Sequence, residues 1–293
     1  MKKISNFFYI ILFFFVLFNS CATSTNNGVS LLKRNSVYHV IEKRPSFISD
    51  GKVREYEFSL NDEIIAKEVI DKKGKKTLYG QKLDGLVKEY DMEGRLLCET
   101  SYKNGVLDGI YKQYGKNQKV VLIKTYSNGI LNGKVTEFYE DGKIKQEANY
   151  KNNLLNGFVN DYSHSEILVR SQEYLDGVLD GDYKEYYTSG IIKISKEYHR
   201  GKLEGYSKEY FKNGSVSKEY NYSQNKLQGE AKIYYDNGKV HQIEFYRDDK
   251  LDGEVKIYDD EDNLRYVDVY SKGKKLKRNI FNEKGKNICT IRY

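Results

Sequence analysis

The chain has 293 residues, with 49 Lys and Arg against 42 Asp and Glu, 28 Tyr, 24 Gly, one Pro and no Trp. Its net charge of +7 is spread over alternating acids and bases, as in Lys184-Glu185 and Lys208-Glu209, which leaves no basic stripe for nucleic acid. The tyrosine content and the three cysteines also exclude a disordered linker and a disulfide-dense miniprotein.

The first 20 residues have the pattern of an export signal. Lys2 and Lys3 precede an apolar run over 7–18, which is shorter than the roughly 20 residues that cross a bilayer. The run leads to Cys21 and resembles a bacterial lipoprotein signal, although Phe18 and Asn19 replace the usual leucine and small residue. This resemblance implies a lipidated Cys21 and, because Ala22 follows it, an exported protein anchored at the outer membrane or cell surface. Cleavage near Ala22, with Cys21 incidental, is the alternative.

The next 62 residues divide into a tether and a β cap. Asn, Ser and Thr over 23–30 are typical of a flexible tether, so we predict a lipidated tether and linker over 21–50. Residues 51–82 alternate like strands around turns such as Lys73-Gly74 but have no regular spacing. We therefore predict an atypical N-terminal β cap over 51–82.

A 24-residue unit then repeats eight times over 83–275. Reference glycines recur at an interval of 24 residues, at Gly85, Gly109, Gly133, Gly157, Gly181, Gly205, Gly229 and Gly253. The first aromatic row lies five residues after them, at Tyr90, Tyr114, Phe138, Tyr162, Tyr186, Tyr210, Tyr234 and Tyr258. The aliphatic row lies eleven residues after them, at Leu96, Val120, Ile144, Leu168, Ile192, Val216, Val240 and Leu264. The second aromatic row lies seventeen residues after them, at Tyr102, Tyr126, Tyr150, Tyr174, Tyr198, Tyr222, Tyr246 and Tyr270.

Each unit is predicted to be a β-hairpin. Glycine-bearing turns such as Glu140-Asp141-Gly142 separate its two strands, and a second turn such as Lys103-Asn104-Gly105 leads to the next hairpin. The turn places the first aromatic row opposite the aliphatic row, and a period of two predicts the second aromatic row on that same face. The expected fold is all-β: an elongated single-layer antiparallel meander of stacked hairpins, ending in a partial capping repeat over 276–293.

Motifs such as Leu107-Asp108-Gly109 and Leu251-Asp252-Gly253, each followed by a tyrosine strand and a Gly turn, resemble MORN repeats. The resemblance covers roughly 61–293 and is nearest to the bacterial variant labelled as a YwqK-type antitoxin. It implies hairpin arrays that serve as interaction or membrane-associated modules. Some relatives carry a phosphatidylinositol-phosphate kinase label. The 24-residue length, and the tyrosines and leucines in place of several glycines, depart from the family pattern.

Catalytic and metal-binding patterns are missing from the sequence. His39, His164, His199 and His241 occupy unrelated places in the repeat, and no nucleotide-binding or hydrolase motif occurs. We predict no enzyme activity, no cofactor and no metal; a calcium site at Asp259-Asp260 with Asp262 is the alternative to a solvated turn. Cys98 and Cys289 are expected to lie too far apart for a disulfide and to be small buried hydrophobes on the tyrosine face.

The aromatic face is the candidate binding surface, since tyrosine offers a large amphipathic contact area at low entropic cost. The predicted partner is a protein, with a glycan or a membrane surface as options, besides the membrane contact through the N-terminal lipid. The alternatives are that the tyrosines form the core, that the protein neutralises a toxin, or, remotely, that it is a lipid kinase. The candidate binding residues are Tyr90, Tyr102, Tyr114, Tyr126, Tyr186, Tyr198, Tyr210, Tyr222, Tyr234, Tyr246, Tyr258 and Tyr270.

Overall fold

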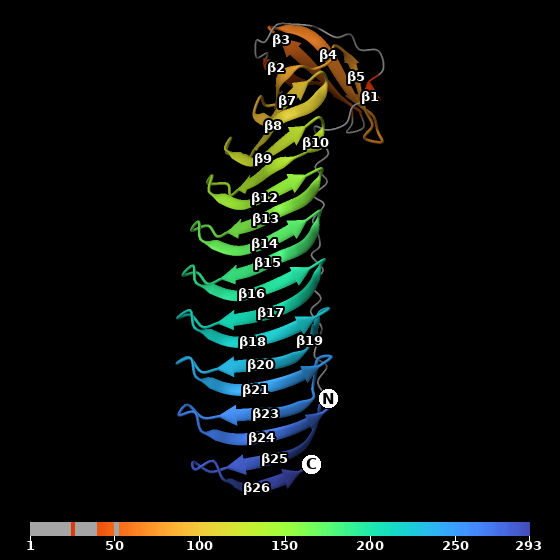
Figure 1. Ribbon diagram of the computed structural model, residues 1–293. Coiled ribbons are helices and arrows are strands. Elements are labelled where there is room, and N and C mark those ends of the chain that lie inside the picture. Colours follow the sequence, from red (N-terminus) through yellow and green to blue (C-terminus); the bar gives the residue numbers. More distant parts are fainter. Residues whose placement is uncertain (1–24, 27–39, 50–52) are drawn as a thin grey trace.

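The computed structural model is a long single-layer ribbon of β-strands that curls over at its N-terminal end (Figure 1). It describes residues 25–26, 40–49 and 53–293, with the side chains of 40–46 and 53–293. Every strand in this part of the chain belongs to one sheet, which confirms the predicted all-β meander. Among the described residues there is no helix long and apolar enough to cross a membrane. The predicted signal over 1–20 and Cys21 lie outside the described residues.

The stacked hairpins occupy most of the ribbon. Successive strands pair antiparallel in chain order, with the second strand of one hairpin paired to the first of the next. Two-residue strands mark places where a bulge divides one strand into two. The strands are β6 (Gly85–Tyr90), β7 (Leu96–Lys103), β8 (Val106–Tyr114), β9 (Val120–Ser127), β10 (Ile130–Leu131), β11 (Gly133–Phe138), β12 (Ile144–Lys151), β13 (Leu154–Tyr162), β14 (Leu168–Leu175), β15 (Val178–Tyr186), β16 (Ile192–His199), β17 (Lys202–Tyr210), β18 (Val216–Ser223), β19 (Lys226–Leu227), β20 (Gly229–Tyr234), β21 (Val240–Arg247), β22 (Lys250–Leu251), β23 (Gly253–Tyr258), β24 (Leu264–Ser271), β25 (Lys274–Phe281) and β26 (Asn287–Arg292).

Two kinds of turn connect these strands. Within a hairpin, the Asp91 amide donates to the Arg95 carbonyl at 3.0 Å and the Gly94 amide donates to the Asp91 carbonyl at 3.1 Å. Between hairpins, both turn residues have a positive φ, 54° at Asn104 and 79° at Gly105, which is the two-residue turn that matches the twist of antiparallel strands. The Asn, Asp and Gly residues that recur here are those that tolerate this conformation.

Successive hairpins are also tied together along the edge formed by the two-residue turns. The Gly105 amide donates to the Leu83 carbonyl at 2.8 Å, and the same bond recurs one repeat later from Gly129 to Leu107 at 2.6 Å. The last of these bonds joins Gly273 to Leu251. Each repeat is therefore stabilised by its neighbours, as expected for a solenoid-like array.

A β-bulge in every hairpin separates the two aromatic rows. Tyr90 lies opposite Leu96, which confirms the predicted pairing of the first aromatic and aliphatic rows, but Glu89 lies opposite Cys98. One extra residue, Leu97, therefore interrupts the alternation of side chains between the two rows. The same shift occurs in each of the other repeats between 83 and 275. The prediction that both aromatic rows share one face is wrong.

The two faces are distinguished by the side chains that meet on them. We call the face that carries Val87, Thr100 and Tyr102 the inner face, because these residues line the N-terminal core. The opposite, outer face carries the first aromatic row: the Arg44 guanidinium lies 4.3 Å from the ring centre of Tyr90. Both faces therefore carry tyrosine together with acids and bases.

The N-terminal cap extends the sheet and folds it over the first repeats. It consists of β2 (Val40–Ser49), β3 (Val53–Leu60), β4 (Glu63–Ile70) and β5 (Lys76–Gly80), paired antiparallel in this order, with β1 (Thr25–Asn26) beside β5. Parallel pairing of β2 with β6 joins the cap to the repeats. The predicted linker over 21–50 is thus too long, since β2 begins at Val40. The core is small and lies here, formed by Ile41, Phe58, Ala66, Leu78, Leu83 and Val87.

The C-terminal segment forms one further hairpin. β25 and β26 pair antiparallel, and the bulge between Ile280 and Phe281 is at the same place as in the preceding hairpins. On the preceding strand, the buried Asp268 carboxylate accepts two hydrogen bonds of 2.7 Å from the Arg278 guanidinium and lies 2.8 Å from the Lys275 ammonium. This charged cluster fixes β25 against β24.

We expect this cluster to make the C-terminal hairpin sensitive to acid. Burial by itself would raise the pKa of Asp268, but hydrogen bonds from Arg278 and Lys275 outweigh it and hold the pKa below its ordinary value. Since the folded pKa is lowered, the stabilisation is complete above the unfolded value of about 4 and is lost as the pH falls through the lower folded value. Asp268→Asn should cost about 2 kcal/mol at neutral pH and remove most of this pH dependence. Hydrogen exchange of the β24–β26 amides between neutral and acid pH measures both effects; equal pH profiles for the two proteins would contradict the assignment.

Candidate functional site

The second aromatic row packs mainly within the inner face. Tyr102 lies against the cap core, and Tyr198 lies 6.0 Å from Tyr183, centre to centre. Burial raises the pKa of Tyr150 and Tyr174 above the ordinary value of tyrosine. Small or polar buried side chains fill the strands beside this row, among them Ala148, Val159, Gln172, Ser207 and Ala231. These contacts are those of a core, as in the alternative stated above for the tyrosines.

The first aromatic row lies half-buried on the outer face, over the aliphatic row. The Tyr234 hydroxyl donates to Glu219 at 2.8 Å, and Glu219 lies 2.8 Å from the Lys208 ammonium of the adjacent strand. Burial and a hydrogen bond to Glu219 raise the pKa of Tyr234 to about 12. Burial and a hydrogen bond to Glu99 likewise raise the pKa of Tyr114 to about 12. The outer face thus presents rings one repeat apart, about 9.6 Å, each bordered by charged groups.

Tyr114 and Tyr234 should titrate late and in step with unfolding. Because the folded pKa is raised, the stabilisation is complete below the unfolded pKa of about 10 and is lost as the pH rises through about 12. Tyr234→Phe removes one phenol that ionises late and costs about 1 kcal/mol through the lost hydrogen bond. Difference absorbance of phenolate during an alkaline titration measures this, with Tyr206→Phe at an exposed ring as the control. A Tyr234→Phe protein that loses a phenol of ordinary pKa would contradict the prediction.

A third set of rings supports the loop edge, and the sequence analysis did not single it out. The hydroxyls of Tyr139, Tyr187 and Tyr235 each donate to a main-chain carbonyl of the next repeat, at 2.7–2.9 Å. These residues directly follow the first aromatic row. Their recurrence at alternate repeats, as Tyr139, Tyr187 and Tyr235, was the signal available in the sequence.

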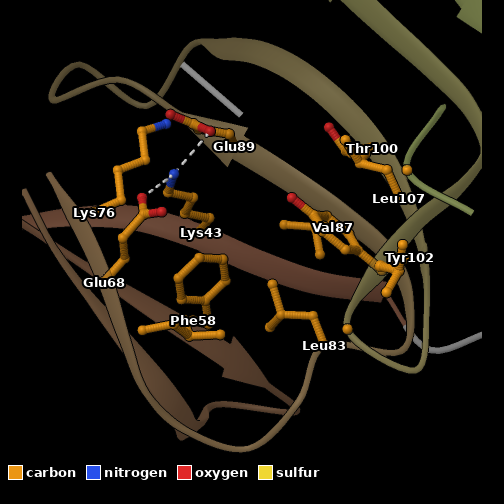
Figure 2. A pocket seen from close by; sticks show the side chains of 14 residues that line it. Lys43, Phe58, Glu68, Lys76, Leu83, Val87, Glu89, Thr100, Tyr102 and Leu107 are labelled. Atoms are coloured by element: carbon orange, nitrogen blue, oxygen red, sulfur yellow. Dashed lines mark ion pairs between the residues drawn. The ribbon is translucent and has the colours of Figure 1, made fainter. Parts of the chain in front are cut away.

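The cap encloses a cavity of about 200 Å³ with a charged end (Figure 2). The Lys43 ammonium lies 2.7 Å from a Glu68 oxygen and 3.1 Å from a Glu89 oxygen, and all three side chains are buried. They come from β2, β4 and β6, so this ion cluster ties the cap to the first repeat. Figure 2 shows Phe58, Leu83 and other apolar side chains below it. Sequence reasoning missed Lys43 because it lies in the segment predicted to be a linker.

The remaining candidate chemical groups are dispersed. His164 stacks on Tyr139, His199 lies 3.2 Å from Asp180, and His241 contacts Tyr235. Within the described ranges, no group of three or more His, Cys, Asp or Glu side chains could hold a metal ion. His39 lies outside these ranges.

The two described cysteines differ in exposure. Cys98 is buried beside Glu89, whereas Cys289 is exposed on β26. The expectation that both are buried is therefore right for Cys98 and wrong for Cys289.

Comparison with known families identifies four of the hairpins. The segments 131–152, 179–200, 203–224 and 227–248 match the model of the MORN repeat variant. Each matched segment starts at the leucine two residues before a reference glycine. The other four hairpins of 83–275 have the same bulge and the same pairing of first aromatic and aliphatic rows. No curated protein matches the chain.

Proposed function

We propose that the protein is a non-enzymatic repeat scaffold of the bacterial cell envelope that binds a protein partner through its outer face. The observation that supports this most directly is the first aromatic row, which repeats over the aliphatic row on one face of the sheet in every hairpin from β6 to β24. MORN-variant repeats in the same region are consistent with a scaffold. The second aromatic row packs within the inner face and is not part of the proposed binding surface.

The outer face has the composition of a protein-binding surface. Half-buried tyrosines supply rigid anchors, and their surroundings are polar enough to remain soluble without a partner. Exposed rings accompany the row, since Phe158, Tyr206 and Phe245 lie on the same face. A partner that covered this face would bury both kinds of ring at once.

Photocrosslinking in intact cells tests this assignment. A photoreactive phenylalanine at Tyr186 or Tyr210 should capture a stoichiometric partner, whereas the same group at Tyr198, on the inner face, should not. Tyr186→Ser with Tyr210→Ser should abolish co-purification, and the matching Phe variants should retain it, because ring contact carries the binding. Equal capture from both faces would overturn the assignment, and capture of one small stoichiometric protein toxin would favour the antitoxin-like alternative.

We also propose that Cys21 carries a lipid that tethers the scaffold to the membrane. The support is the sequence pattern before Cys21, since this residue lies outside the described part of the chain. Cys21→Ser should move the protein from the detergent extract of membranes into the soluble fraction or the medium. Identical partitioning of the two proteins would refute the anchor without affecting the assignment of the outer face.

A further inference from the structure

One row of exposed residues changes its chemistry midway along the molecule. The turn row consists of the residues directly after the two-residue turns: Val106, Ile130, Leu154, Val178, Lys202, Lys226, Lys250 and Lys274. The first four are aliphatic and the last four are lysine. The aliphatic four are 40–47% exposed, so they do not belong to the core.

The fold does not require aliphatic residues at these positions. Val106 lies opposite Lys103 beside its turn, just as Lys202 lies opposite His199 and Lys226 lies opposite Ser223. The later repeats thus act as internal controls, because the same backbone position accepts lysine. Four exposed aliphatic side chains in succession are then best explained by contact with another molecule.

The aliphatic half forms a continuous strip. Each of three aliphatic side chains lies against the turn glycine of the next repeat: Val106 against Gly129, Leu154 against Gly177 and Val178 against Gly201. In each pair, a side-chain carbon lies within about 3.4 Å of the point that a Cβ would occupy on the glycine. Leu175, which is also exposed, pairs with Val178 and widens the strip. At about 9.6 Å per repeat the strip is about 29 Å long.

The lysine half is electropositive. Its four turn segments, 199–204, 223–228, 247–252 and 271–276, contain eight Lys and Arg against four Asp and Glu. The corresponding segments of the aliphatic half, 103–108, 127–132, 151–156 and 175–180, contain two Lys against three Asp. Three of these cations are paired: Lys226 lies 3.2 Å from Asp248, Arg247 lies 3.4 Å from Asp252, and Lys275 lies 2.8 Å from the buried Asp268. Part of this charge is therefore already compensated. An acidic partner would complement the remainder.

We propose that the turn row docks one amphipathic helix of a partner protein, with aliphatic residues over the first half and acidic residues over the second. A heptad of helix rises about 10.5 Å, which is close to the repeat spacing of about 9.6 Å, so helix residues one heptad apart can meet successive positions of the row. A β-strand fits less well, because three residues span one repeat and successive contacts would then point to opposite sides. Aliphatic side chains in a single row are also typical of a helix seam. The inference rests on the proposed protein binding but uses residues at the turn edge, separate from the first aromatic row.

The test uses the full-length protein and two labelled synthetic helices of about 45 residues, the length of the whole row. One peptide has leucine once per heptad in one half and glutamate at the same positions in the other; the second has lysine in place of glutamate. Fluorescence anisotropy should show the glutamate peptide binding at least about tenfold more tightly. V106K/I130K/L154K/V178K should weaken binding of that peptide at least about tenfold while retaining the circular dichroism of the unmodified protein.

Two further arms separate this proposal from others. The outer-face variant Tyr186→Ser with Tyr210→Ser should bind the peptide normally. Peptide binding to the turn row would therefore still be observed if the outer aromatic row turned out not to bind a partner. Vesicles containing phosphatidylglycerol test the alternative that the row lies on a membrane. The helix assignment would be overturned if the peptide does not bind, or if the quadruple variant binds it with unchanged affinity. It would also be overturned if the protein binds the vesicles and the quadruple variant loses this binding while the outer-face variant keeps it.

Discussion

Lys43→Met should open the N-terminal cap. The Lys43 ammonium is the shared partner of the Glu68 and Glu89 carboxylates, and its side chain is only 5% exposed. Removing one partner of a buried ion cluster leaves uncompensated charge in a poorly solvated site and typically costs about 3–5 kcal/mol. The loss should appear as faster hydrogen exchange in β2–β5, because these strands depend on the cluster for their contact with β6.

Two controls separate this effect from a general loss of charge. Lys67→Met breaks the exposed pair between Lys67 and Glu57 on the neighbouring strands and should leave cap exchange almost unchanged. The triple variant Lys43→Met, Glu68→Gln, Glu89→Gln removes the unbalanced charge and should recover most of the lost stability. If Lys43→Met behaves like Lys67→Met, the cluster does not hold the cap.

Gly109→Ala should break the register of the hairpin at β8. Gly109 has φ +111°, a conformation that L-residues rarely adopt, and a Cβ there would lie 3.0 Å from the Cβ of Ser101. The combination of strain and close contact should cost about 2–3 kcal/mol. Hydrogen exchange of β7–β9 is the appropriate measurement, because unfolding of a repeat array need not be two-state.

A glycine in the other kind of turn provides the matched control. Gly190 also has a positive φ, +82°, but nothing lies within 4 Å of the site of its Cβ. Other repeats place Gln118, Glu166 and Asp262 at the equivalent position with φ of 60–71°. Gly190→Asn should therefore cost about 1 kcal/mol or less. Similar losses at Gly109 and Gly190 would show that the close contact with Ser101 is unimportant.

The hairpins could be predicted because turn chemistry repeats at a constant interval. Asn-Gly pairs such as Asn128-Gly129 indicate the two-residue turn directly, and the pairing of Tyr90 with Leu96 follows from the length of the loop between them. Local backbone preference determines both features, so a single sequence contains enough information.

The bulge could not be predicted because nothing in the composition marks it. The extra residue is Leu97 in the first repeat, but Lys145 and His241 hold the same position in others. In the first repeat it is an exposed leucine that looks like part of the hydrophobic alternation. A one-residue insertion moves every following side chain to the other face. Regular alternation without this insertion places both aromatic rows on one surface, whereas the bulge places them on opposite surfaces.

The cap was only partly predictable for a different reason. Strand β2 occurs once and contains Pro45 and several charged residues, so it lacks the repetition that identified the hairpins. Its partner β6 is distant in the chain, and parallel pairing with it has no local sequence signal. The role of Lys43 depends on that pairing and therefore becomes visible only in the folded protein.

The parallel pairing of β2 with β6 also sets an order of events during synthesis. Every later hairpin closes between neighbours in the chain, a local step that takes microseconds. Strand β2 emerges early but must wait for the residues 86–89 that pair with it. Contacts between distant residues form slowly, since closing a long loop has to precede any gain from them. The hairpins of the cap and of the repeats should thus close first, and the contact between β2 and β6 should be the last of that neighbourhood to become protected.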